Sequence, residues 1–151
     1  MHFSECAVLF RRAPTRLRRG AIEAFARRLR ERVTKGREFV CLITDDRELR
    51  RLNREFLGRD YSTDVLSFPA GGKTGTSLVL GELAISAQRA AEQAREFGHP
   101  LEEEIRILML HGVLHLTGLD HERDSGRMAH AEAAWRRKLG LGRGLIERVS
   151  A

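Results

Sequence analysis

The order of apolar and polar positions along the chain predicts four strands and five helices. Short apolar runs, which are typical of strands, occur over residues 3–10, 39–44, 65–68 and 78–86. Apolar residues that recur every three or four positions predict helices over residues 14–33, 45–56, 86–97, 100–116 and 124–139. The mixed order predicts an α+β fold, with a small mixed sheet of about four strands covered by about five helices.

Turn-forming residues set the expected boundaries of these elements. Pro14 is expected to open the first helix, because proline suits the first helical turn. Asp124 or Ser125 is expected to cap the last helix. Residues 58–64 are polar and residues 70–77 contain three glycines, so both segments are predicted to be loops.

The predicted helix over residues 100–116 is apolar on nearly every face. From residue 105 onward its polar side chains are Arg106, His111 and His115. A helix without a polar face belongs in the core. Buried imidazoles need partners, and one metal ion would satisfy both histidines together.

Three histidines in this region have the spacing of a metal site. His111 and His115 lie one helical turn apart, on the same face. Gly118 can take the positive φ that ends a helix, so the chain can fold back and bring His121 to the other two. Three imidazoles leave one zinc position for water, as in catalytic zinc sites. We therefore expect one Zn²⁺ ion held by His111, His115, His121 and water.

The same spacing occurs in metzincin peptidases, whose zinc motif reads H-E-x-x-H-x-x-G-x-x-H. Both histidine intervals and the glycine at position 118 match this motif. The departure is Gly112, which stands where those peptidases carry their general-base glutamate. The alternative, three unrelated histidines on a buried helix, does not account for the glycine in register.

The charge of the chain favours an acidic partner. The net charge is +6, and all but three of the 27 basic residues are arginines, which suit forked contacts to phosphate. Residues 11–37 contain eleven basic and two acidic residues. This segment is compatible with nucleic-acid binding, and a solvated helix face explains it equally well.

Length and composition indicate one soluble domain in a reducing compartment. A chain of 151 residues can bury one core. It has no uncharged apolar run of membrane-spanning length, and its start does not resemble a signal peptide. Cys6 and Cys41 fall in apolar runs, which favours two buried thiols. We expect a cytoplasmic protein with no membrane contact.

Two groups of residues resemble one family. The first is the run His-Gly-Val-Leu-His-Leu-Thr-Gly-Leu-Asp-His at 111–121, and the second lies at 52–53, 58–60 and 63–69. Residues 80–82 and 85–86 are also similar. Together they resemble the YbeY family of bacterial rRNA maturation factors, regarded as metal-dependent endoribonucleases specific for single strands. The resemblance extends in order along nearly the whole chain.

This resemblance implies a single metal-dependent endoribonuclease domain over residues 1–151, with an α+β fold. It implies zinc at His111, His115 and His121, and single-stranded RNA as the substrate. The implied role is 16S rRNA 3′-end processing and ribosome quality control. The implied partners are the small ribosomal subunit and its assembly factors.

One position departs from the family pattern. Many members carry an arginine just before the glycine that opens the residue 58–60 stretch, and that arginine is thought to matter for activity. This chain has Leu57 there. Arg59, where a lysine or arginine is usual, either supplies the needed charge alone or leaves a weak nuclease.

Further residues are candidates for substrate contacts. Arg59 is the candidate catalytic residue, and with Lys73 it would hold the phosphate group. Tyr61, the only tyrosine, is a candidate stacking platform for a base or an ordinary loop residue. Asp120 and Glu122 flank His121 and either orient imidazoles or are surface turn residues.

Three functions compete at this point. Zinc lowers the pKa of bound water to about 7, so RNA hydrolysis does not require a strong base. A metallopeptidase would need a replacement base such as Glu82, whose simpler explanation is an outward side chain on a strand. A non-catalytic assembly factor would hold structural zinc, which usually has four protein ligands.

Overall fold

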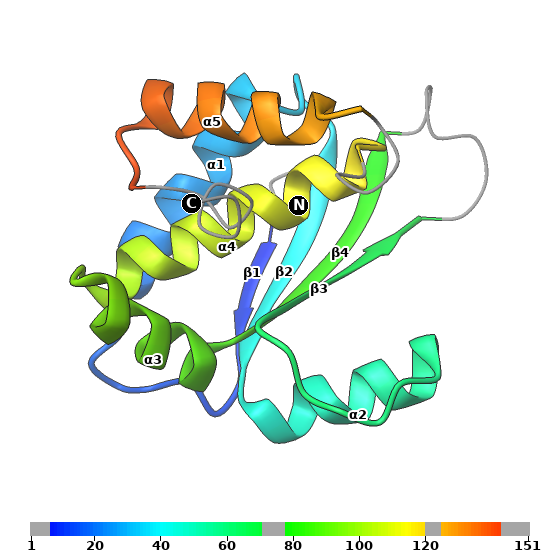
Figure 1. The fold of residues 1–151 in the computed structure, drawn as a ribbon, viewed down its shortest axis with the longest axis vertical. Coiled ribbons are helices and arrows are strands. Elements are labelled where there is room, and N and C mark those ends of the chain that lie inside the picture. Colours follow the sequence, from blue (N-terminus) through cyan, green and yellow to red (C-terminus); the bar gives the residue numbers. More distant parts are fainter. Residues whose placement is uncertain (1–6, 71–77, 120–124, 143–151) are drawn as a thin grey trace, which may run out of the picture.

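The computed structural model describes residues 7–70, 78–119 and 125–142. Within these ranges the elements follow the order β1 (Ala7–Phe10), α1 (Arg19–Arg32), β2 (Glu38–Thr44), α2 (Asp46–Leu57), β3 (Val65–Pro69), β4 (Val79–Ser86), α3 (Ala87–Phe97), α4 (Leu101–Leu116) and α5 (Arg127–Leu139) (Figure 1). The predicted α+β class and the predicted order of elements are confirmed.

The four strands form one mixed sheet in the order β1-β2-β4-β3. Strands β1, β2 and β4 are parallel, and β3 runs antiparallel to β4. Val65 pairs with Ile85 at one end of β3, and Pro69 pairs with Gly81 at the other. Because β3 pairs with β4 alone in this order, one side of β3 is an edge of the sheet.

Helices cover the two faces of the sheet unequally. Helices α1 and α4 pack on one face and enclose the main core, while α2 lies on the other face (Figure 1). The smaller core under α2 is built from Leu49, Leu66 and Ala84. Helices α3 and α5 pack against α4. As a result α4 is surrounded by other elements.

Helix α4 is buried, as its apolar sequence predicts. Its buried residues lie on every face and include Glu104, Ile105, Leu108 and His111. The Glu104 carboxylate lies 2.6 Å from His99 Nε2, so this buried charge has a partner. Acidic residues in the first turn also suit the positive end of the helix dipole.

Helix α1 begins at Arg19, five residues after the predicted start at Pro14. The Leu17 N–H donates to the Pro14 carbonyl at 3.2 Å, and this turn buries the Leu17 side chain. The Arg18 N–H then donates to the Glu102 carboxylate of α4 at 2.9 Å. A tertiary contact therefore sets the start of this helix.

Helix α5 also begins later than predicted. Its N-cap residue is Gly126, with φ 84°, so the prediction that Ser125 caps this helix is wrong. Ser125 has φ 57°, so two successive residues in the left-handed region precede the helix. Such residues cannot continue a right-handed helix, which explains the later start. Asp124 itself lies outside the described residues.

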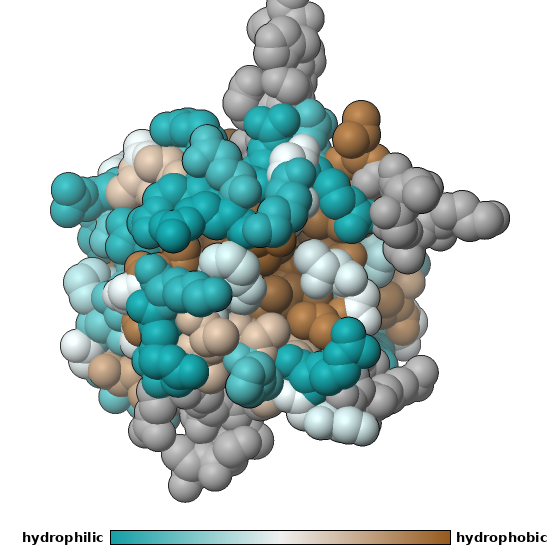
Figure 2. Space-filling view, turned by 90° about the horizontal axis from the view of Figure 1, so that it is seen from above, coloured by the Kyte–Doolittle hydropathy of each residue, from teal (hydrophilic) through white to brown (hydrophobic). Residues whose placement is uncertain are grey.

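The buried position predicted for Cys41 is confirmed. Figure 2 shows, from above, a face that is mostly hydrophilic, with hydrophobic residues grouped near its centre. Cys41 is buried in β2 and keeps its thiol, while Cys6 lies outside the described residues. Across the described ranges, no helix is both long enough and apolar enough to cross a membrane.

A buried carboxylate anchors the start of α2, the helix that leads into loop 58–64. The Glu48 side chain is 4% exposed and accepts hydrogen bonds from Arg11, Arg12 and Arg51. Asp45 accepts from the Glu48 N–H at 3.0 Å and from Arg12 Nε at 2.9 Å. Burial raises the pKa of Glu48, but the three guanidinium groups outweigh it and hold the pKa below its ordinary value.

We predict that Glu48→Gln lowers the free energy of unfolding by about 2 kcal/mol at pH 7, less than for a fully buried pair because its arginines are half exposed. A carboxyl group whose pKa is lower in the folded than in the unfolded state stabilises the folded protein fully at pH values above the unfolded pKa. This stabilisation is lost as the pH falls through the folded pKa. The difference from wild type should therefore shrink as the pH falls below 4.5, the ordinary pKa of a glutamate side chain.

Urea unfolding at several pH values measures this difference. Glu55→Gln is the control, because Glu55 also pairs with Arg51 but is 47% exposed. Its effect should stay below about 0.5 kcal/mol. A Glu48→Gln deficit that does not shrink at all between pH 7 and pH 3 would contradict the electrostatic explanation.

Candidate metal site

His111 and His115 meet on one face of α4, as their spacing predicts. Their ring centroids are 4.9 Å apart, with an angle of 71° between the ring planes. His111 is 7% exposed, and His115 is more accessible. Helix geometry alone places two such side chains together, because residues i and i+4 lie one above the other.

Both rings line a cavity of about 340 Å³. The opposite wall consists of residues 63–67, which are the end of the loop after α2 and the first half of β3. The cavity therefore lies between the core helix α4 and the edge strand of the sheet. Two segments that are about 45 residues apart in the chain form it, and Ser67 and Gly112 connect them.

Gly112 allows α4 to approach the sheet closely. A Cβ atom at this position would lie 2.7 Å from Leu83 Cδ2 and 3.3 Å from Ser67 Oγ. The Ser67 hydroxyl donates to the Gly112 carbonyl at 3.2 Å. Position 112 therefore faces β3 and β4, where there is no room for a glutamate side chain. The close packing of α4 on the sheet thus favours glycine at the position where the peptidase motif has a glutamate.

Glu132 of α5 contacts the Nδ1 atom of His111. Its carboxylate is 0% exposed, and Glu132 Oε2 lies 2.6 Å from His111 Nδ1. An ionised carboxylate keeps the proton on Nδ1 and leaves the lone pair on Nε2, the form of imidazole that binds metals. This arrangement is typical of metal-ligating histidines.

Glu132 is not among the site residues predicted from the sequence, although the sequence contains a signal for it. The inner stripe of the last helix reads Met128, Ala131, Trp135 and Leu139, and Glu132 lies within that stripe. An acidic residue on an apolar stripe indicates a buried carboxylate that needs a partner. The sequence does not indicate which residue that partner is.

The third predicted ligand, His121, lies outside the described residues. The turn before it is described: the Gly118 N–H donates to the His115 carbonyl at 2.9 Å, and Gly118 has φ 103°. The positive φ predicted for Gly118 is confirmed. Among the described residues, no three His, Cys, Asp or Glu side chains are placed to hold a metal ion. The two imidazoles of the cavity fit a borderline divalent ion such as zinc.

Two other predicted site residues lie in the loop after α2. Arg59 is exposed, its N–H donates to the Asn53 carbonyl at 3.2 Å, and it does not line the cavity. Tyr61 is 53% exposed, and its carbonyl accepts from Asn53 Nδ2 at 2.9 Å. Asn53 is 1% exposed and so ties this loop to α2. The roles of Arg59 and Tyr61 stay predictions.

Three further predicted site residues lie outside the described ranges, and one residue of the cavity was not predicted. Lys73, Asp120 and Glu122 lie outside those ranges. Asp64, which lines the cavity, was not identified from the sequence. It accepts from the Val65 N–H at 2.7 Å and from Gln93 Nε2 at 3.1 Å, so donors from β3 and α3 hold its carboxylate.

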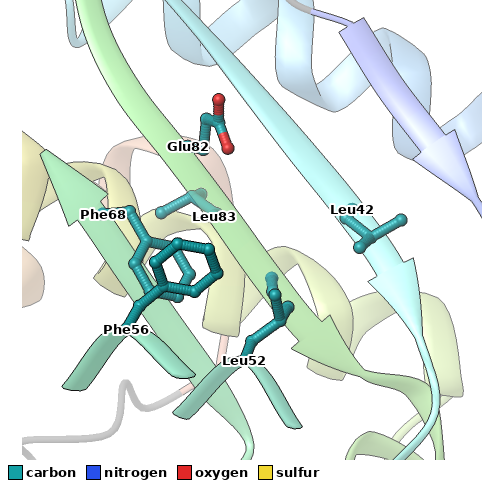
Figure 3. Close-up of a pocket in the computed structure, with 7 residues that line it drawn as sticks. Leu42, Leu52, Phe56, Phe68, Glu82 and Leu83 are labelled. Carbon is teal, nitrogen blue, oxygen red and sulfur yellow. The ribbon is translucent and has the colours of Figure 1, made fainter. Parts of the chain in front are cut away.

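A second, apolar hollow lies on the α2 side of the sheet. Phe56 and Phe68 meet edge to face there, with ring centroids 5.8 Å apart, and Leu42 and Leu52 line the same hollow (Figure 3). Glu82 points to this side, as expected for an outward side chain on a strand. Its neighbour in β4, Leu83, packs against α4, so Glu82 lies on the opposite face from the histidines and cannot replace the peptidase base.

We predict that Gly112→Ala lowers the free energy of unfolding by about 1–3 kcal/mol, because the buried Leu83 side chain must move. Gly112→Glu should destabilise more and should not create peptidase activity. Gly20→Ala in α1 is the control, because a Cβ there meets nothing within 4 Å. Thermal and urea unfolding measure the change. Equal stability of the two alanine variants would contradict the close approach of α4.

The sequence and the fold are similar to those of known proteins. Residues 12–140 match the family described as Endoribonuclease YbeY. An endoribonuclease YbeY of Solibacter usitatus is 64% identical over 145 residues, which are 96% of this chain and 95% of the relative. One of Koribacter versatilis is 47% identical over 132 residues, covering 86% and 83%.

A solved structure supports the same relationship. The solution structure of a Thermotoga maritima protein superposes with a TM-score of 0.60 and 27% identity. The match covers 86% of this chain and 85% of that one. With the family match over residues 12–140 and relatives this similar, the chain belongs to the YbeY family of endoribonucleases.

Proposed function

We propose that this protein is a metal-dependent endoribonuclease that cleaves single-stranded RNA in the cavity between α4 and β3. Membership of the family supports cleavage of RNA. The observation that supports this cavity as the site of cleavage is that His111 and His115 both line it, while buried Glu132 contacts His111. Residues 1–151 would act as a single domain.

His111, His115 and His121 would hold one zinc ion, with water at the remaining position. A divalent ion bound there supplies activation of water and polarisation of a phosphoryl oxygen. The protein's contribution is to fix the ligands. Glu132 keeps the proton of His111 on Nδ1, and Gly112 lets the helix carry both imidazoles to the edge strand.

The proposed substrate is ribosomal RNA, in 16S rRNA 3′-end processing and ribosome quality control in the cytoplasm. The proposed partners are the small ribosomal subunit and its assembly factors. The net charge of +6 favours such partners. Exposed Arg59 and Tyr61, together with Lys73, are the candidates for contacts with phosphate and base.

We predict that purified protein cleaves single-stranded RNA, that a chelator stops cleavage, and that added zinc restores it. His115→Ala should lower the rate at least 100-fold, because removing a metal ligand removes the activated water. Arg59→Ala should lower it about 10–100-fold through weaker phosphate contacts. His130→Ala, exposed on α5, is the control and should cleave like wild type.

Each alternative function has its own outcome in this assay. Chelator-sensitive loss of an unstructured protein, with RNA left intact, would indicate a peptidase. A protein that retains zinc but cleaves neither substrate would indicate a non-catalytic assembly factor, the alternative that Leu57 favours. Cleavage by His115→Ala at the wild-type rate would show that the activity is contamination.

We predict that Glu132→Gln weakens zinc binding about 10–100-fold, because a neutral amide no longer fixes the His111 tautomer. Glu104→Gln is a matched control, since Glu104 is also 0% exposed and also lies 2.6 Å from a histidine, His99. Both variants should lose stability, but Glu104→Gln should bind zinc like wild type. Competition with a chromophoric chelator measures the affinity. Equal zinc affinities of the two variants would contradict this role of Glu132.

A further inference from the structure

The hydrogen bonds of β3 show which of its backbone groups face away from the sheet. The Ser86 N–H donates to the Asp64 carbonyl at 2.9 Å, and the Ala70 N–H donates to the Leu80 carbonyl at 2.9 Å. In an antiparallel pair, residues that bond to the partner strand alternate with residues that do not. The even positions 64, 66, 68 and 70 therefore face β4, and the odd positions 65, 67 and 69 direct their N–H and C=O groups outward.

Ser67 provides the one outward N–H of β3 that donates to no other group in the described part of the chain. The Val65 N–H donates to the Asp64 carboxylate at 2.7 Å. Pro69 has no N–H. No hydrogen bond joins the Ser67 N–H to another described residue. The hydrogen bond that Ser67 makes to the Gly112 carbonyl comes from its hydroxyl. An N–H group at a sheet edge requires water or a ligand.

Ser67, which carries this N–H, belongs to the wall of the histidine cavity. Ser67 lines the cavity together with His111 and His115. None of the described residues in that wall is a lysine or an arginine. The N–H is also held firmly, since β4 pairs with both neighbouring positions and the Ser67 hydroxyl is tied to α4. A fixed donor of this kind stabilises charge without reorganising during the reaction.

We propose that the main-chain N–H of Ser67 donates a hydrogen bond to a non-bridging oxygen of an RNA phosphodiester bound between β3 and the two histidines. This inference rests on the proposed function. The N–H gives up no proton and forms no covalent bond. It stabilises the negative charge that grows on that oxygen as the new P–O bond forms and the bond to the leaving ribose oxygen breaks.

The edge is better suited to one phosphate than to a peptide strand. A peptide that adds to a sheet needs a series of donors and acceptors along the edge. Here Pro69 lacks its donor, and the Val65 donor is taken by Asp64. A single phosphate oxygen needs only the Ser67 N–H.

The first experiment uses the unmodified, zinc-loaded protein and a ten-nucleotide single-stranded RNA with 2′-O-methyl groups, shown on a gel to stay intact. In ¹H–¹⁵N spectra, the amide proton of Ser67 should move downfield as this RNA is added. The amide protons of Leu66 and Phe68, which face β4, are internal controls and should move less. If His111 and His115 respond to the RNA while Ser67 does not, the inference is wrong although the proposed function stands.

The second experiment compares Ser67→Ala with Ser67→Pro. Alanine removes the hydroxyl and keeps the N–H, while proline removes both; proline is tolerated at an edge position whose N–H points outward. Ser67→Ala therefore sets the reference rate. Ser67→Pro should cleave RNA about 10²–10³-fold more slowly than this reference, the loss typical of one removed oxyanion donor, with unchanged zinc affinity.

Equal cleavage by the two variants would overturn the inference. Thermal unfolding shows whether Ser67→Pro is folded, and if it is not, the spectra of the unmodified protein decide. Failure of the proposed function gives a different result, because unmodified protein would then neither cleave single-stranded RNA nor show any response of its cavity residues to the 2′-O-methyl RNA.

Discussion

The contact of α4 with the sheet at Gly112 is the constraint on which the site depends. The helix backbone lies directly against Leu83 and Ser67, so the histidines on either side of this glycine reach the edge of the sheet. A bulkier residue would separate the helix from β3 and widen the cavity between them. The same contact occupies the position from which a metzincin glutamate would act. One packing requirement therefore both shapes the cavity and excludes one type of chemistry.

Two buried glutamate–histidine pairs hold α4 in this position. Glu104 in its first turn pairs with His99, and His111 near its other end pairs with Glu132 of α5. A buried carboxylate without a partner destabilises a protein by several kcal/mol, so the fold strongly favours keeping both pairs formed. The second pair also gives α5, a late element of the chain, a direct part in orienting a candidate metal ligand.

Much of this arrangement could be predicted from the sequence. Helical spacing alone places His111 and His115 on one face, and the apolar sequence of α4 places that helix in the core. Tertiary contacts, in contrast, cannot be predicted from the local periodicity of the sequence. The contact between Arg18 and Glu102 sets the start of α1, and the pairing of Glu132 with His111 links residues with no periodic relationship.

Strand order is the other feature that local patterns do not contain. The sequence predicts four strands but not that β4 lies between β2 and β3. The position of β3 at the edge, and with it the outward N–H of Ser67, follows from that order. His121 and Lys73 stay predictions, because they lie outside the described residues.

The inner stripe of α5 has an optical consequence. Trp135 is the only tryptophan of the chain, and it lies on the same helix as Glu132, partly buried against the core. Lys138 Nζ lies 4.7 Å from the centre of its ring. Intrinsic fluorescence excited at the indole therefore comes from the one helix whose docking orients His111, and its emission is a built-in reporter of that docking.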